Sequence, residues 1–492
     1  PFPLRVNQGN FIINTNAPTN PSKEEIINQA FKFHSQGNTS EATKYYQYFI
    51  KEGYKDHRVF SNYGDILRGL GNLQEAEILT RKAIKIRPDF ADAYLNLGNI
   101  LRSLCKLKEA EVSTRKAIEL NPNFPNAHSN LGLILRDIGN LQEAEVSTRK
   151  AIELNPNFSD AYSILGGILK DLGNLKEAEL STRKAIELNP NFADSHSNLG
   201  ITLKDLGNLK EAEVSLRKAI QIKPNFANFH SNLGTILIYM GKFKEAEISL
   251  KKAIKLKPDY AIAYRYLSIC LYIRGDKSSA LEYILKATSL DPKETINRVL
   301  INICEEDEKK NSFSKEILET NPLILNRPVE PELINSLYKI RALDQAVYIA
   351  PTYGNARGSD YYLFERNEPI IQMIKKDIIS IASESVKSDV MITDSFFTIS
   401  KSGAGLISHN HLGELDRIND LNLSEKKFSL VYYLSIGDQN CEEPGILKLE
   451  DPNQEILPTN DLIIIFPAKR KHSVFYKGEK DRIIIGVNFY SI

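Results

Sequence analysis

The chain has 492 residues, of which 42% are hydrophobic and 25% are charged, and its formal net charge is +1. This composition is that of an ordinary soluble globular protein, and the length predicts two or more domains. The balanced charge argues against general attraction to nucleic acid or to an anionic membrane. Apolar runs such as "LIIIF" are also far too short to cross a bilayer. We therefore expect neither nucleic acid nor a membrane as a partner.

The first residues and the cysteines indicate the compartment. Residues 1–22 lack the apolar stretch of a signal peptide, and their Asn, Pro and Thr content predicts a flexible leader. The four cysteines are scattered without a close pair, which argues against a disulfide framework and suits a reducing environment. Together these features predict a cytoplasmic protein.

Residues 23–294 repeat themselves with a step of 34 residues. Alanines and glycines recur at this step, and so do the prolines Pro88, Pro122, Pro156, Pro190, Pro224, Pro258 and Pro292. Each unit, for example "FADAYLNLGNILRSLCKLKEAEVSTRKAIELNPN", predicts two amphipathic helices around a short turn. The small residues let the paired helices approach closely, and proline ends the second helix because it cannot donate to the preceding turn.

This pattern resembles the tetratricopeptide repeat, whose Leu-Gly, Ala and Pro positions are occupied almost throughout. About eight units fit into residues 23–294, and the first, which departs most from the pattern, is expected to cap the stack. The resemblance implies an all-α solenoid. His128, His196 and His230 share one repeat position with tyrosines in other units, which favours packing over metal binding.

One repeat position is favourable for binding a partner. It is occupied by Asn62, Asn96, Asn130, Asn198 and Asn232, and it is interrupted by Ile164 and Tyr266. In tetratricopeptide solenoids similar to this one, asparagine at this place faces the concave surface. A ladder of amides there can hydrogen-bond the backbone of an extended protein segment or peptide. The alternative, an interhelical or self-capping amide, stays open.

The repeat stops after Pro292, and residues 295–344 predict a helical cap and linker. Residues 345–492 predict an all-β domain. Six short runs rich in β-branched and aromatic residues, from "VMITDSFFTIS" to "RIIIGVNFYSI", indicate an antiparallel sandwich or barrel. An amphipathic helix over residues 368–387 is expected to cover one sheet.

The β region holds three of the chain's eight histidines. In extended backbone, His409 and His411 point to the same side and can face one metal ion. His472 opens a later strand, and Arg482 opens the last one. The short segment "SVFYKGEKD" between them predicts a hairpin that would place these two strands side by side.

This order of residues resembles the iron(II)- and 2-oxoglutarate-dependent oxygenases over residues 345–492. The resemblance also includes "LVYYLS", "PGILKLEDP" and "DRIIIGVNFY". It implies a double-stranded β-helix (jelly-roll) fold in which His409, His411 and His472 hold Fe(II), and it allows for ascorbate. It further implies that Arg482 pairs with the distal carboxylate of 2-oxoglutarate, for which a planar guanidinium is well suited. Tyr433 would donate its hydroxyl to the same carboxylate.

The chain departs from the family where most members have a carboxylate, because His411 stands there. Glu414 is a candidate for the missing acid, although its offset from His409 breaks the same-face geometry. The spacing "GAGLISHNH" also resembles the metal-binding cupins, but their glutamate spacing fails here and they do not require Arg482.

We therefore predict an oxygenase (hydroxylase) whose repeats recruit a protein or peptide substrate, with no catalytic side chain beyond the metal centre. Two alternatives stay open. One is a non-catalytic scaffold with a degenerate oxygenase domain, and the other is an oxygenase that acts on a small molecule.

Overall fold

The structure is a computed structural model that describes residues 21–305, 321–340 and 356–492. Most of the predicted leader, and parts of the predicted linker, lie outside these residues. The chain divides into two compact units, Pro1–Ile138 and Gly139–Ile492, and each is described by itself. Within the described ranges, no helix is long and apolar enough to span a membrane.

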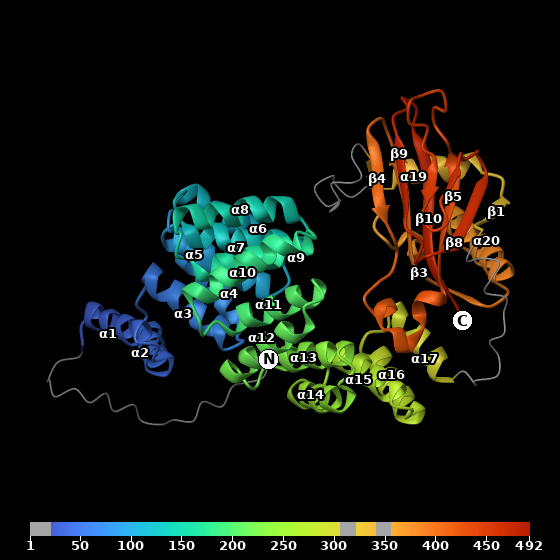
Figure 1. Cartoon of the computed structure of the whole chain (residues 1–492). Coiled ribbons are helices and arrows are strands. Elements are labelled where there is room, and N and C mark those ends of the chain that lie inside the picture. Colours follow the sequence, from blue (N-terminus) through green and yellow to red (C-terminus); the bar gives the residue numbers. More distant parts are fainter. Residues whose placement is uncertain (1–20, 306–320, 341–355) are drawn as a thin grey trace. The chain divides into compact units, whose positions relative to one another are not determined.

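The first unit consists of successive helices of nearly equal length, as the repeat predicts (Figure 1). They are α1 Lys23–Ser35, α2 Thr39–Lys51, α3 His57–Gly69, α4 Leu73–Ile86, α5 Ala91–Ser103, α6 Leu107–Leu120 and α7 Pro125–Ile138. The repeated alanines Ala42, Ala76 and Ala110 are fully buried between helices. An added Cβ at Gly98 would overlap with Thr114 Oγ1 on the paired helix, so this close approach requires glycine.

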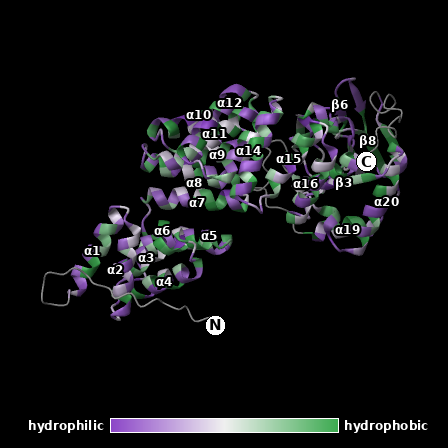
Figure 2. Cartoon of the chain, turned by 90° about the horizontal axis from the view of Figure 1, so that it is seen from below, coloured by the Kyte–Doolittle hydropathy of each residue, from purple (hydrophilic) through white to green (hydrophobic). Residues whose placement is uncertain are grey.

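The second unit continues the solenoid and then adds the β region. Its repeat helices are α8 Leu141–Leu154, α9 Ser159–Asp171, α10 Leu175–Leu188, α11 Ala193–Asp205, α12 Leu209–Ile222, α13 Ala227–Tyr239, α14 Phe243–Leu256, α15 Ala261–Ile273 and α16 Lys277–Leu290. Helix α17, Thr295–Glu305, buries Val299 and Leu300 in the same core and so extends the solenoid, as expected. Figure 2 shows that these helices carry hydrophobic and hydrophilic residues together, as amphipathic helices do.

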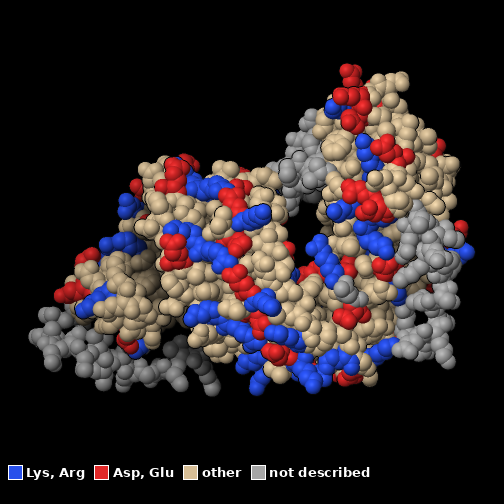
Figure 3. Space-filling view, in the orientation of Figure 1, with Lys and Arg blue, Asp and Glu red and all other residues tan. Residues whose placement is uncertain are grey.

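Charged side chains form regular rows on the repeat helices (Figure 3). Within a helix, Arg183 pairs with Glu179 four residues earlier at 2.8 Å, and it also reaches Glu211 of the next repeat at 2.6 Å. Arg149 and Arg217 make the corresponding pairs. These pairs are exposed, so each stabilises the helices only by about 0.3–0.5 kcal/mol.

One turn of the solenoid is strained. The turn after the first helix of a repeat contains a residue in the left-handed region. This residue is a glycine in typical repeats, such as Gly71, Gly173 and Gly207, but in one repeat it is Cys105, with φ 59°. We expect Cys105→Gly to raise the free energy of unfolding by up to about 1 kcal/mol, since the left-handed conformation disfavours a Cβ. Urea denaturation checks this, with Ser103→Gly, at the last residue of helix α5, as a control that should be destabilised. Equal destabilisation by both changes would contradict the account.

The β region forms two antiparallel sheets (Figure 1). The larger sheet has the order β1-β8-β5-β10-β3-β2 and the smaller β4-β9-β6-β7. The strands are β1 Leu323–Asn326, β2 Ala356–Gly358, β3 Val390–Ser400, β4 Ala404–His409, β5 Lys427–Ser435, β6 Leu447–Leu449, β7 Gln454–Ile456, β8 Leu462–Pro467, β9 His472–Tyr476 and β10 Arg482–Ser491. The six predicted runs are confirmed as β3, β5, β6, β8, β9 and β10.

Helix α20, Pro369–Val386, covers the larger sheet as predicted, with Ile371, Ile374 and Ile378 in one core with Phe397 and Ile485. The larger sheet also includes a strand from the segment that was predicted as a linker, before residue 345. Strand β1 pairs with β8, and α19, Pro331–Lys339, packs into the same core. The four residues of β1 are too few to show a periodicity that distinguishes a strand from a helix.

Candidate metal centre

Three imidazoles come together at one end of the smaller sheet. His409 ends β4 and His472 begins β9, and the two residues are partners in the register of these strands. His411 lies just beyond β4, where its N–H donates to the Ala468 carbonyl at 3.0 Å. The ring centroids are 4.3 to 5.0 Å apart, and one ligand atom of each ring lies within 4.8 Å of the other two. The three predicted ligands therefore form one cluster that is able to hold a metal ion.

Burial keeps two of these imidazoles neutral. Burial and the neighbouring His409 lower the pKa of His472 to about 3, although the Arg470 carbonyl raises it slightly. Burial, followed by His472 and His409, holds the pKa of His411 well below its usual value. A metal ion binds the neutral form of histidine, so these side chains are ready to bind it at neutral pH.

The same shifts predict how stability depends on pH. In the unfolded chain these histidines take up protons near pH 6.5, whereas folded His472 does so only near pH 3. The unfolded state therefore binds more protons between these values. The metal-free protein should lose stability as pH falls from about 6.5 towards 3, by at most about 1.4 kcal/mol per pH unit for each imidazole. Urea unfolding at several pH values checks this, and His472→Gln should show a smaller loss. An equal loss in both proteins would contradict it.

Two polar residues beside the cluster were missed by the sequence reasoning. Asn488 Nδ2 lies 3.4 Å from His411 Nδ1 and donates to Asp394 Oδ1, while its own Oδ1 accepts from Ser429 at 2.7 Å. Burial raises the pKa of Asp394, against the hydrogen bonds from Asn488 and Thr393. A signal was present, since Asp394 and Asn488 stand in strands that are rich in β-branched and aromatic residues. The contact with Asn488 can fix the orientation of the His411 ring.

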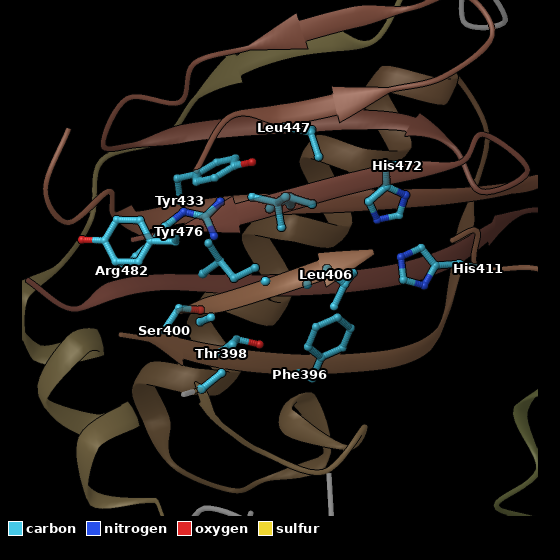
Figure 4. A pocket seen from close by; sticks show the side chains of 17 residues that line it. Phe396, Thr398, Ser400, Leu406, His411, Tyr433, Leu447, His472, Tyr476 and Arg482 are labelled. Carbon is cyan, nitrogen blue, oxygen red and sulfur yellow. The ribbon is translucent and has the colours of Figure 1, made fainter. Parts of the chain in front are cut away.

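A buried guanidinium shares the pocket with the imidazoles (Figure 4). His411 and His472 lie at one end, Arg482 and Tyr433 lie at the other, and Leu406 and Leu447 line the space between them. Arg482 is 3% exposed, and its guanidinium lies 5.2 Å from the centre of the Tyr433 ring. Its Nη2 is 3.4 Å from the Gly445 carbonyl, while its Nε has no hydrogen-bond partner in the part of the chain that the structure describes. Among the described residues no carboxylate pairs with it, and burial lowers its pKa.

The predicted hairpin between the strands of His472 and Arg482 is wrong. Strand β9 belongs to the smaller sheet and β10 to the larger one, so the segment between them crosses from one sheet to the other. The two side chains nevertheless line the same pocket. The sequence spacing predicted that His472 and Arg482 lie near one pocket, but it predicted the wrong connection between their strands.

Glu414 is not placed with the imidazoles. Its carboxylate pairs with Lys204 of helix α11 at 2.5 Å. Asp416, another acid near the cluster, is buried and pairs with Lys427 at 2.9 Å. The group of potential ligands in the described residues consists of the three histidines alone.

The asparagine column makes contacts between helices. Its amide nitrogens donate to the preceding repeat, in the pairs Asn96–Ser61 (3.0 Å), Asn130–Asn99 (2.8 Å), Asn198–Ser163 (3.3 Å) and Asn232–Ser197 (3.3 Å). Asn62 hydrogen-bonds Tyr46. These contacts favour the interhelical alternative, and peptide binding by the same side chains stays a prediction. The column of His128, His196 and His230 is bonded to proline carbonyls, as a packing role predicts.

Sequence models of the tetratricopeptide repeat match residues 35–89, 91–124, 125–158, 159–192, 193–226 and 231–295. These matches cover more than half of the chain. The chain therefore belongs to the tetratricopeptide repeat proteins, and its repeats form a scaffold of the kind that supports protein–protein interaction. The comparison with curated proteins found no match.

Several solved structures are similar to the chain. The Cut9–Hcn1 hetero-tetramer of the APC/C matches 58% of this chain with a TM-score of 0.50 at 16% identity, and the match covers 56% of that protein. A tetratricopeptide repeat protein from Parabacteroides merdae matches 51% with a TM-score of 0.42 at 20% identity, covering 99% of that protein. PilF from Pseudomonas aeruginosa matches 41% with a TM-score of 0.37 at 20% identity, covering 92% of it. At 16% identity, the similarity to the Cut9–Hcn1 structure shows a shared fold and nothing further.

Proposed function

We propose that the protein is an iron(II)- and 2-oxoglutarate-dependent oxygenase whose repeats recruit a protein substrate. The observation that carries this proposal is that a group able to bind a cation and a group able to bind an anion lie in one pocket. Three clustered imidazoles, two of them kept neutral by burial, can hold a divalent cation, and a buried guanidinium without a described carboxylate partner can hold an anion. A ligand that bridges them must have a carboxylate at one end and metal-binding oxygens at the other, and 2-oxoglutarate has both.

The strand order supports a double-stranded β-helix. If β3 to β10 are taken as eight consecutive strands, the first, eighth, third and sixth pair in one sheet, and the second, seventh, fourth and fifth in the other. This is the order expected when a long hairpin folds over into a jelly roll. Strands β1 and β2 extend the edges of the larger sheet. In this arrangement the histidines lie at the end of the second strand and the start of the seventh.

Each side chain then has a defined task. His409, His411 and His472 would hold Fe(II), which supplies oxygen activation when bound, so that 2-oxoglutarate, O₂ and a C–H bond give succinate, CO₂ and an alcohol. Arg482 binds the distal carboxylate through charge-assisted hydrogen bonds, and Tyr433 positions the guanidinium through its ring. Apolar walls around Leu447 and Ile484 exclude water and strengthen these electrostatic contacts.

The main rival is a non-catalytic scaffold, and His411 in place of the family's carboxylate favours it. Three imidazoles leave the metal more positive than two imidazoles and an acid would. Succinate release from 2-oxoglutarate with added Fe(II) and ascorbate separates the two functions. The proposal predicts catalytic turnover, and its absence in a protein that binds both ligands would favour the scaffold.

A further inference from the structure

The segment that follows His411 lies between two parts of the second unit. We call residues 413–425 the docking segment; it contains the short helices η3 Leu415–Arg417, η4 Asn419–Leu421 and η5 Leu423–Glu425. Its apolar side chains share one core with the repeat helices, namely Leu415, Ile418, Leu421 and Leu423. Repeat residues of this core include Leu267 and Cys270 of helix α15.

Polar contacts fix the segment on the repeat side. Glu414 pairs with Lys204 of α11 at 2.5 Å, and its carbonyl oxygen accepts from the Tyr239 hydroxyl of α13 at 2.7 Å. Tyr266 of α15 is buried beside the same residue, and burial followed by the Glu414 carboxylate raises the pKa of Tyr266. Glu414 is therefore held by side chains from three successive repeats.

The repeat pattern changes where this contact is made. In the first unit, Arg102 pairs at 2.5 Å with Asp137, which lies 35 residues later. The repeat position of Asp137 is occupied by Asp171 and Asp205 in the next two repeats, and then by Tyr239. Lys204 therefore has no aspartate 35 residues later, and it pairs with Glu414. The asparagine column likewise ends at Asn232, and Tyr266 stands at its next place. Tyr239 and Tyr266, which stand at these two departures from the repeat pattern, both lie beside Glu414. This indicates that the repeat surface is adapted to the docking segment.

The other side of the segment is anchored to the β sheets. Asp416 is buried, and its carboxylate accepts from the Gly413 N–H at 2.6 Å, from Lys427 at 2.9 Å and from the Tyr490 hydroxyl. Gly413 lies only two residues beyond His411. A movement of the segment would therefore be transmitted to this imidazole.

We propose that Lys204, Tyr239 and Tyr266 form a docking surface for the segment after His411, and that this surface holds His411 in position for the metal. The effect on metal affinity rests on the proposed function, whereas the docking itself does not. A loop that is already ordered binds a ligand more tightly, because less conformational entropy is lost on binding. The repeats thus serve the metal centre as well as any partner.

The test uses the full-length protein and a matched pair of lysines. Lys170 occupies the same repeat position as Lys204, and each pairs with the aspartate that follows it, Lys170 with Asp171 at 2.9 Å and Lys204 with Asp205 at 3.3 Å. Only the Lys204 ion pairs in the described residues include the docking segment. Anaerobic Co(II) titration, followed by visible absorption, measures metal affinity, and hydrogen exchange of residues 411–425 measures docking. Lys204→Glu should weaken Co(II) binding about tenfold and speed exchange. Lys170→Glu should do neither, and Glu414→Lys combined with Lys204→Glu should restore both.

Two results would overturn the inference. One is unchanged exchange and affinity in Lys204→Glu, and the other is an equal effect of both lysine changes. Loss of affinity in Glu414→Gln with none in Lys204→Glu would make Glu414 a ligand instead. If the parent protein bound no Co(II), the proposed function would fail, while faster exchange in Lys204→Glu would still establish the docking.

Discussion

Arg482→Met is expected to abolish 2-oxoglutarate binding and, at the same time, to stabilise the metal-free protein. A buried charge without an opposite charge costs free energy, and replacing it by an apolar side chain of similar volume removes that cost. We expect the free energy of unfolding to rise by about 1–2 kcal/mol. The dicarboxylate loses its charge partner, which should weaken its binding at least about 100-fold. Calorimetry with 2-oxoglutarate and urea unfolding measure the two effects.

Arg470→Met is the matched control. Arg470 is 4% exposed, but it donates to the carbonyls of Glu450 at 3.2 Å and Pro452 at 2.5 Å, and to Gln454 Oε1 at 3.2 Å. Its loss leaves these acceptors unsatisfied, so this variant should be less stable and should still bind 2-oxoglutarate. If Arg482→Met were destabilised in the same way, the role of Arg482 would be structural and not ligand binding.

His472→Ala is expected to remove metal binding and catalytic turnover together. His472 is the buried member of the cluster and, of the three proposed ligands, the one on the later strand. Losing a direct ligand should lower affinity for Fe(II) by at least about 100-fold, more than the loss of an outer residue such as Asn488. Strand β9 pairs with β4 and β6 through its backbone, so the fold should persist.

His230→Ala provides the comparison for this variant. His230 bonds the Pro224 carbonyl at 2.8 Å within the repeats and has no place in the proposed site. Anaerobic Fe(II) titration and succinate release should be unchanged in it. Metal binding of parental strength by His472→Ala would show that the three imidazoles are not the ligands.

The solenoid was predictable because its signals are local and repeated. Alanine, glycine and proline return every 34 residues, and each fixes one feature of a helix pair. Strands were predictable where they are long and apolar, as in β5 and β10. Strand β1, with four residues, and strand β4, with the sequence "AGLISH", were not predictable. Strand pairing depends on distant parts of the chain, which explains why the sequence predicted the wrong path from His472 to Arg482.

The site was predictable to the extent that it depends on rare residue types. Three histidines and one arginine in an apolar region pointed to a pocket, and the structure brings them together. The role of Glu414 could not be predicted, because its partners Lys204 and Tyr239 lie about two hundred residues away. Asp394 and Asn488 were missed for the same reason, since only the pairing of β3 with β10 makes them neighbours.

We propose that a metal held by three imidazoles and a dicarboxylate held by Arg482 share one pocket. Anaerobic calorimetry of 2-oxoglutarate binding, with and without saturating Fe(II), tests it most directly. We expect Fe(II) to tighten 2-oxoglutarate binding and 2-oxoglutarate to tighten Fe(II) binding by the same factor, because linkage is reciprocal. Equal affinities with and without the metal, or no binding of either ligand, would contradict it.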